Sequence, residues 1–142
     1  TLAQQPLLAG IKHLNRLEQV LIKSQPLPDG YNDWLVYDTQ ANVIEASMAN
    51  IFVVKSRQVF TPAINQAGVS GVMREAVIEA LLSIGIDVRI QRLSQRDIVD
   101  ADSIMMSNSL FGIIDVIKVD KTSYQPWLNT IAVAQKLQTT LS

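Results

Sequence analysis

The stretch Asn50-Ile51-Phe52-Val53-Val54-Lys55-Ser56-Arg57-Gln58-Val59-Phe60-Thr61-Pro62 decides how this chain folds. Its two apolar runs flank the polar pair Ser56-Arg57, and this arrangement predicts two antiparallel strands joined by a tight turn. Upstream, the apolar runs 33–37 and 43–45 are separated by the polar segment 38–42, which suits a second hairpin turn. The four runs together predict an antiparallel meander.

Helices are expected on both sides of this block. Apolar residues recur at helical spacing over about 14–24, 70–83 and 126–141, with Gly85 suited to the C-terminal cap of the second helix. Ser94 suits the N-cap of a short helix over 94–98. Strands are expected at 88–91 and 103–106. Because strands and helices do not alternate regularly, the sequence predicts one domain of mixed α/β (α+β) class over residues 1–142.

Composition excludes several classes of function. The chain has 142 residues, of which 48% are hydrophobic, and its net charge is −1. With no run of like charges, we expect no nucleic acid or membrane as partner. The absence of cysteine and the single histidine, His13, exclude disulfides and predict no metal site. No signal peptide is recognised, so a cytoplasmic protein is expected. The chain begins at Thr1, and we expect it to be part of a longer protein.

Lys12 follows the apolar run 7–11 and precedes Leu14, Leu17 and Leu21, which are spaced as on one face of a helix. A cation at such a strand-to-helix junction is disfavoured by the positive end of the helix dipole. Apolar neighbours would lower the pKa of the amine further. A partly neutral lysine is a nucleophile suited to a Schiff base with a carbonyl cofactor. The alternative is an ordinary surface lysine in a loop.

Three other segments carry polar groups where a ligand is expected. Val69 and Ser70 stand at a predicted helix start, where free backbone N–H groups and a hydroxyl suit an anion, although Ser70 also suits a simple N-cap. Asn108 and Ser109 follow a predicted buried strand, as ligand contacts or as a turn. Glu45 lies between two apolar strands, either exposed at a turn or buried with a cationic partner.

The ordered set of these segments resembles the fold-type IV pyridoxal-phosphate enzymes. The set consists of Lys12, then Glu45 with Asn50-Ile51-Phe52, then Gly68-Val69-Ser70, then Ser107-Asn108-Ser109. The resemblance covers nearly the whole chain and is weakest after about Asp115, where several relatives have proline. It implies the C-terminal domain of that family, with an antiparallel-rich mixed sheet or barrel and flanking helices. It also implies that the family's smaller N-terminal domain is absent from this chain.

The resemblance implies a role for each matching residue. Lys12 corresponds to the lysine that binds the cofactor, pyridoxal 5'-phosphate, and then moves protons. Glu45 corresponds to the carboxylate that keeps the pyridine nitrogen protonated. Asn15 and Arg16 follow the lysine and are assigned a position near the substrate.

The remaining matches concern the cofactor phosphate. Val69 and Ser70 correspond to the helix-start residues that bind it through backbone amides and a hydroxyl. Asn108 and Ser109 correspond to a second phosphate-binding turn, in which Ser109 supplies the side-chain contact. In the family, an arginine from the smaller domain also binds the phosphate, and no part of this chain matches it.

Within the family, residues 8–21 and 65–74 are most similar to the lyases that convert 4-amino-4-deoxychorismate to 4-aminobenzoate and pyruvate in folate biosynthesis. A small-molecule substrate and a homodimer are therefore implied. One alternative is an aminotransferase for D-amino or branched-chain amino acids, because the cofactor-binding residues are shared. The other is a non-catalytic binding or oligomerisation module, in which Lys12 is a solvated lysine.

Overall fold

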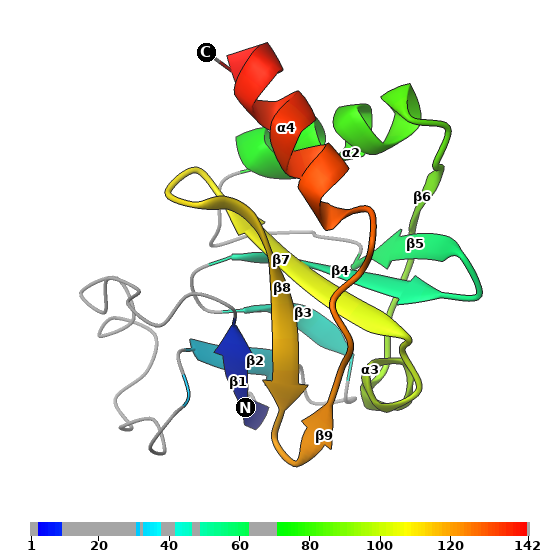
Figure 1. Ribbon diagram of the computed structural model, residues 1–142. Coiled ribbons are helices and arrows are strands. Elements are labelled where there is room, and N and C mark those ends of the chain that lie inside the picture. Colours follow the sequence, from blue (N-terminus) through cyan, green and yellow to red (C-terminus); the bar gives the residue numbers. More distant parts are fainter. Residues whose placement is uncertain are drawn as a thin grey trace.

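The computed structural model describes residues 3–9, 31, 33–37, 42–46, 49–62 and 71–141, which form a mixed sheet with flanking helices (Figure 1). The elements are β1 (Ala3–Ala9), β2 (Asp33–Tyr37), β3 (Val43–Ala46), β4 (Asn50–Lys55), β5 (Gln58–Thr61), α2 (Gly71–Ser83), β6 (Val88–Ile90), α3 (Gln95–Val99), β7 (Ser103–Asn108), β8 (Gly112–Val119), β9 (Thr122–Ser123) and α4 (Thr130–Leu141). The helix predicted over 14–24 lies outside the described residues.

The strands of the described chain form one sheet in the order β3-β2-β1-β8-β7-β4-β5-β6, with β9 paired to β8. Only β5 and β6 pair in parallel, so the predicted antiparallel-rich mixed sheet is confirmed. The predicted hairpins β2–β3 and β4–β5 are also confirmed. The meander is wrong as a whole, because β3 is an edge strand and β4 pairs with β7 instead. Turn residues specify only the pairing of neighbouring strands, whereas the order of hairpins depends on distant segments.

The β4–β5 turn shows why its residues suit a tight hairpin. Ser56 and Arg57 have φ values of 51° and 67°, and the flanking residues Lys55 and Gln58 pair directly. Positive φ at both central positions matches the right-handed twist of the strands. The turn therefore sets the register that places Val53 opposite Phe60.

The two edges of the sheet approach each other through the segment that follows β6. The Val43 amide donates to the Leu93 carbonyl at 2.6 Å, and Asn42 forms an isolated bridge with Ser94. The sheet thus curls into the barrel-like form that the family resemblance implies. One apolar core gathers side chains from β2, β4, β7, β8 and the α3 region, including Leu35, Ile51, Val53, Leu93, Ile98, Ile104, Met106 and Val116.

The helices α2 and α4 pack against each other and over one face of the sheet (Figure 1). Their buried side chains form a second core with strand residues, including Phe52, Val54, Met73, Val77, Leu81, Met105, Val133 and Leu137. Alternate residues of β4 and β7 face the two cores, as strand geometry requires. No helix in the described part of the chain is long and apolar enough to cross a membrane.

The segment after Ser109 departs most from the sequence analysis. Residues 112–119 form β8, which lies in the middle of the sheet between β1 and β7 and was not expected as a strand. Asp115 interrupts its apolar pattern and accepts hydrogen bonds from the Trp127 amide at 3.2 Å and the Thr130 hydroxyl at 2.7 Å. The Asp115 carboxylate thus fixes residues 127–130 against β8. The helix α4 begins at Thr130 rather than near residue 126.

Candidate functional site

Six strands of the described sheet run in one direction, and four of them, β1, β3, β5 and β7, lead to or contain residues singled out in the sequence. The register pairs β1 antiparallel to β2 and β8, β3 to β2, β7 to β8 and β4, and β5 to β4. The strands β1, β3, β5 and β7 are therefore parallel in direction, although they alternate with strands of the opposite sense. We call the end at which these four strands finish the site end.

The residues singled out in the sequence follow or end these four strands. Lys12 comes three residues after the last residue of β1, and Glu45 is the last but one in β3. Val69 and Ser70 lie between β5 and α2 in sequence, and Asn108 ends β7. The backbone of β3 places Glu45 opposite Val36. Among the described residues, the ends of β1, β3, β5 and β7, which precede or carry these sequence segments, thus lie at one end of the sheet.

Several candidates lie outside the described residues, so their predicted roles stay predictions. These residues are Lys12, Asn15, Arg16, Val69 and Ser70. For Glu45 the structure describes the backbone only.

Asn108 and Ser109 form the turn between β7 and β8, and Asn108 pairs with Gly112 across it. The Asn108 carboxamide oxygen accepts hydrogen bonds from the Leu110 amide at 2.9 Å and the Phe111 amide at 3.0 Å. This oxygen therefore serves the turn itself, as asparagine often does. Ser109 is exposed, so its hydroxyl faces solvent at the site end. Of this pair, Ser109 is suited to touch a ligand and Asn108 to shape the turn.

One residue before this turn, polar side chains are buried inside the sheet. Asn50 of β4 and Ser107 of β7 are direct partners in the register and are 1% and 0% exposed. The Ser107 hydroxyl has no hydrogen-bond partner. Buried polar atoms of this kind are rare and call for an explanation. The sequence pattern marks Ser107 together with Asn108 and Ser109, as ligand contacts or a turn, but carries no signal that the Ser107 hydroxyl is buried without a partner.

Arg74 is another buried polar residue near this end, and sequence analysis left it without a role. It lies in the first turn of α2 and is 9% exposed. Its Nη2 donates to the Pro62 carbonyl, just beyond β5, at 3.2 Å, while its Nε is buried without a hydrogen-bond partner. An arginine in an otherwise apolar helix start is the one sequence signal that marks it.

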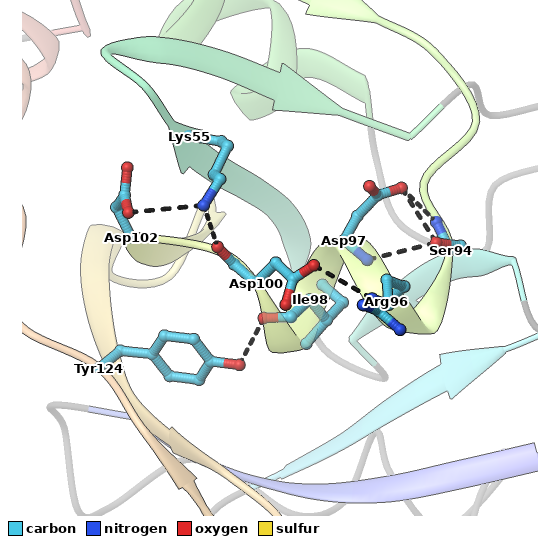
Figure 2. Close-up of polar contacts among 8 residues, drawn as sticks. All are labelled: Lys55, Ser94, Arg96, Asp97, Ile98, Asp100, Asp102 and Tyr124. Carbon is cyan, nitrogen blue, oxygen red and sulfur yellow. Dashed lines mark hydrogen bonds and ion pairs between the residues drawn. The ribbon is translucent and has the colours of Figure 1, made fainter.

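The opposite end of the sheet, which we call the α3 end, is polar but well paired (Figure 2). Ser94 and Asp97 form a capping box at the start of α3, as the serine predicted. Lys55 Nζ donates to the Asp100 carbonyl at 2.8 Å and lies 3.9 Å from Asp102. The Tyr124 hydroxyl donates to the Ile98 carbonyl.

Tyr124 is the described residue whose titration departs clearly from its ordinary value. Burial, aided by the negative charge of Asp100, raises the pKa of the Tyr124 hydroxyl to about 12. The hydroxyl therefore stays protonated and keeps donating to Ile98. This behaviour fits a structural tyrosine of the α3 end. Among the described residues no group of histidine, cysteine, aspartate and glutamate is arranged to hold a metal ion.

The fold agrees with the comparisons to known proteins. Residues 1–119 match the family model described as amino-transferase class IV, and the chain belongs to that family. It is 46% identical over 112 residues to an aminodeoxychorismate lyase of Vibrio harveyi, which covers 79% of this chain and 41% of the relative. The chain thus spans less than half the length of that curated relative.

Two solved structures share the fold at appreciable identity. The 4-amino-4-deoxychorismate lyase of Pseudomonas aeruginosa is 36% identical with a TM-score of 0.73, over 99% of this chain and 50% of that one. An aminotransferase of Brucella abortus, solved with the cofactor PLP bound, is 29% identical with a TM-score of 0.70, over 79% of this chain and 40% of that one. The family resemblance drawn from the sequence motifs is therefore confirmed.

Proposed function

We propose that the chain is the C-terminal, cofactor-binding domain of a lyase that depends on pyridoxal phosphate. Its reaction converts 4-amino-4-deoxychorismate to 4-aminobenzoate and pyruvate. The observation that carries this proposal is the common end of β1, β3, β5 and β7, each of which leads to or contains one set of family residues. The 46% identity to a curated lyase supports the choice of reaction.

The described residues fit the phosphate end of this cofactor. Exposed Ser109 offers a hydroxyl, and the turn beneath it is held by the Asn108 carboxamide. Arg74 adds a buried positive charge in the first turn of α2, directly after Val69 and Ser70 in sequence. A helix start with free N–H groups, a hydroxyl and a cation is a suitable donor set for a phosphate.

When bound, pyridoxal phosphate supplies a carbonyl that links to amines and a ring that withdraws electrons from the carbon next to the bound amine. Lys12 would hold this cofactor through its amine, and the amine would be free for proton transfer when the substrate is bound. The freed Lys12 amine then takes the proton from the amine-bearing ring carbon of the substrate, as a general base. It next gives a proton to the departing enolpyruvyl group. Glu45 keeps the pyridine nitrogen protonated throughout.

Asn15 and Arg16 are assigned to the substrate side of Lys12, and the remaining chain orients the reactants. Product aromaticity favours the elimination, so the protein mainly supplies position and proton transfer. By the family resemblance we also propose a homodimer, a cytoplasmic location and a role in folate biosynthesis. The competing proposal is an aminotransferase, which the similarity to the Brucella abortus protein favours.

The sharpest test of the cofactor site is covalent trapping. Borohydride reduction of the protein with pyridoxal phosphate should attach the cofactor to Lys12, as read by peptide mass spectrometry. We expect Lys12→Ala to lose this label, while Lys136→Ala, which changes an exposed lysine of α4, keeps it. Equal labelling of Lys12→Ala would show that the assignment of Lys12 is wrong.

The reaction is tested by comparing two assays on the same preparation. Pyruvate release from 4-amino-4-deoxychorismate is expected. Amino transfer from D-alanine, glutamate or a branched-chain amino acid to a keto acid should be much slower. Transamination without pyruvate release would contradict the lyase proposal and favour the aminotransferase. Absence of both reactions and of the Lys12 label would favour the non-catalytic module.

A further inference from the structure

Arg74 occupies an unfavourable position for a cation. It lies in the first turn of α2, a helix of 13 residues, and that turn contains no acidic side chain. The positive end of a helix dipole repels a cation, and burial adds a desolvation penalty. Arg74 is nevertheless 9% exposed. Something other than the stability of the isolated helix must account for an arginine here.

The contacts of Arg74 compensate its charge only in part. Its Nη1 lies 3.5 Å from the carboxylate of Glu75, whose side chain is 65% exposed to solvent. Its Nη2 reaches the Pro62 carbonyl at 3.2 Å, and Nε has no partner. A solvated carboxylate and one neutral carbonyl are weak partners for a buried guanidinium. The Arg74 charge in the first turn of α2 is therefore only partly compensated.

The same contacts connect two elements of the site end. The guanidinium joins the first turn of α2 to Pro62, which follows the last residue of β5. Beside it, the Thr61 hydroxyl donates to the Ile51 carbonyl at 2.8 Å, so the end of β5 is itself held to β4. The helix start is thereby anchored to the sheet through Arg74. A fixed helix start presents its N–H groups in a constant direction.

We propose that Arg74 is a positioning residue for the phosphate of the cofactor. It favours phosphate binding in two ways: it anchors the start of α2, and it places a fixed positive charge in the first turn of that helix. This inference rests on the proposed function, since it assumes a phosphate at that helix start. Arg74 then supplies a positive charge for the phosphate from this chain itself. The family arginine from the smaller domain is then not the sole positive charge there.

The test compares pyridoxal phosphate with pyridoxal, which has the same ring and aldehyde without the phosphate. Dissociation constants of both compounds are measured by absorbance for the wild-type protein, Arg74→Met, Arg74→Lys and the control Arg92→Met, which removes an exposed arginine. We expect Arg74→Met to weaken the binding of pyridoxal phosphate about tenfold and the binding of pyridoxal hardly at all. Arg74→Lys should restore much of the loss, because it keeps the charge, and Arg92→Met should change neither constant.

The outcomes separate this inference from the proposed function. Equal weakening of both compounds by Arg74→Met and by Arg74→Lys would show that Arg74 is a structural strut, as would unchanged binding with a lowered melting temperature. Either result overturns the positioning role alone. A wild-type protein that binds neither compound overturns the proposed function, and the role of Arg74 falls with it. If Arg74→Met does not fold, the test uses Arg74→Lys. A ratio of the dissociation constants for pyridoxal phosphate and pyridoxal close to the wild-type ratio supports the role of the charge, and equal weakening of both compounds contradicts it.

Discussion

The two ends of the sheet treat polar side chains differently. At the α3 end, exposed groups such as Lys55, Asp97 and Asp102 pair with one another or with backbone atoms. The hydroxyls of the buried residues Tyr124 and Ser103 each donate to a backbone carbonyl. At the site end, Ser107 Oγ and Arg74 Nε are buried without partners. Exposed, paired groups stabilise a loop at little cost, whereas buried and unpaired groups cost stability.

This difference indicates where the molecule accepts an energetic cost for function. Proteins break their local rules mainly at functional sites, so unpaired buried atoms mark such sites better than a dense polar network does. The polar contacts of the α3 end hold α3 in place (Figure 2). The Ser56 amide also donates to the Asp102 carboxylate at 2.9 Å, which holds the β4–β5 turn. The following changes test whether the two ends separate binding from stability.

Among the changes that follow, the largest effect on cofactor binding is expected from Asn108→Ala at the site end. The change removes the acceptor for the Leu110 and Phe111 amides and loosens the turn that carries Ser109. We expect pyridoxal phosphate to bind about tenfold more weakly, which corresponds to about 1.4 kcal/mol. Asn108→Asp is the matched variant: it keeps the acceptor oxygens and the melting temperature, but its charge should repel the phosphate. Wild-type affinity in Asn108→Ala would remove this turn from the binding site.

An intermediate effect, on stability alone, is expected from Tyr124→Phe at the α3 end. The Ile98 carbonyl loses the Tyr124 hydroxyl and keeps only the Ala101 amide, at 3.3 Å, as a donor. Loss of one hydrogen bond costs about 0.5–1.5 kcal/mol in the free energy of unfolding. Tyr31→Phe is the matched control, since Tyr31 donates to the Asp120 carbonyl at an exposed site and should cost less. Chemical denaturation measures both. A loss of cofactor affinity in Tyr124→Phe without a loss of stability would break the separation between the two ends.

The same tyrosine predicts a pH dependence. Folding raises the pKa of the Tyr124 hydroxyl from 10 to about 12, so the native state favours the protonated form. This contribution to stability is complete below pH 10 and is lost as the pH rises toward about 12. The wild-type protein should therefore lose more stability than Tyr124→Phe between these pH values. Parallel curves for the two proteins in denaturation at several pH values would contradict this account.

The smallest effect is expected from Lys55→Met. Its ion pair with Asp102 is 3.9 Å long, and the two side chains are 51% and 58% exposed. Exposed pairs contribute about 0–1 kcal/mol, so we expect a change of about 0.5 kcal/mol or less and unchanged cofactor binding. A larger loss, measured by chemical denaturation, would mean that the hydrogen bond from Lys55 to the Asp100 carbonyl holds α3 in place.

Much of the local structure follows from short sequence patterns. The bounds of β2 and β4, the Ser56-Arg57 turn and the Ser94 cap agree with prediction because each depends on residues close in sequence. The strand β8 was missed because Asp115 interrupts its apolar run, and its partners Trp127 and Thr130 are distant in sequence. Arg74 was missed, and the burial of Ser107 was not foreseen, because burial is not visible in a sequence.

By itself the sequence determined the family, the hairpins, the helix caps and the ordered motifs that indicate a cofactor. Local backbone preferences and residue chemistry act over a few neighbours, so they can be read along the chain. Only the tertiary structure decided the order of the strands, the common end to which four of them lead, and the burial of Arg74 and Ser107. Those features arise from pairing and packing between segments far apart in sequence, which no local pattern specifies.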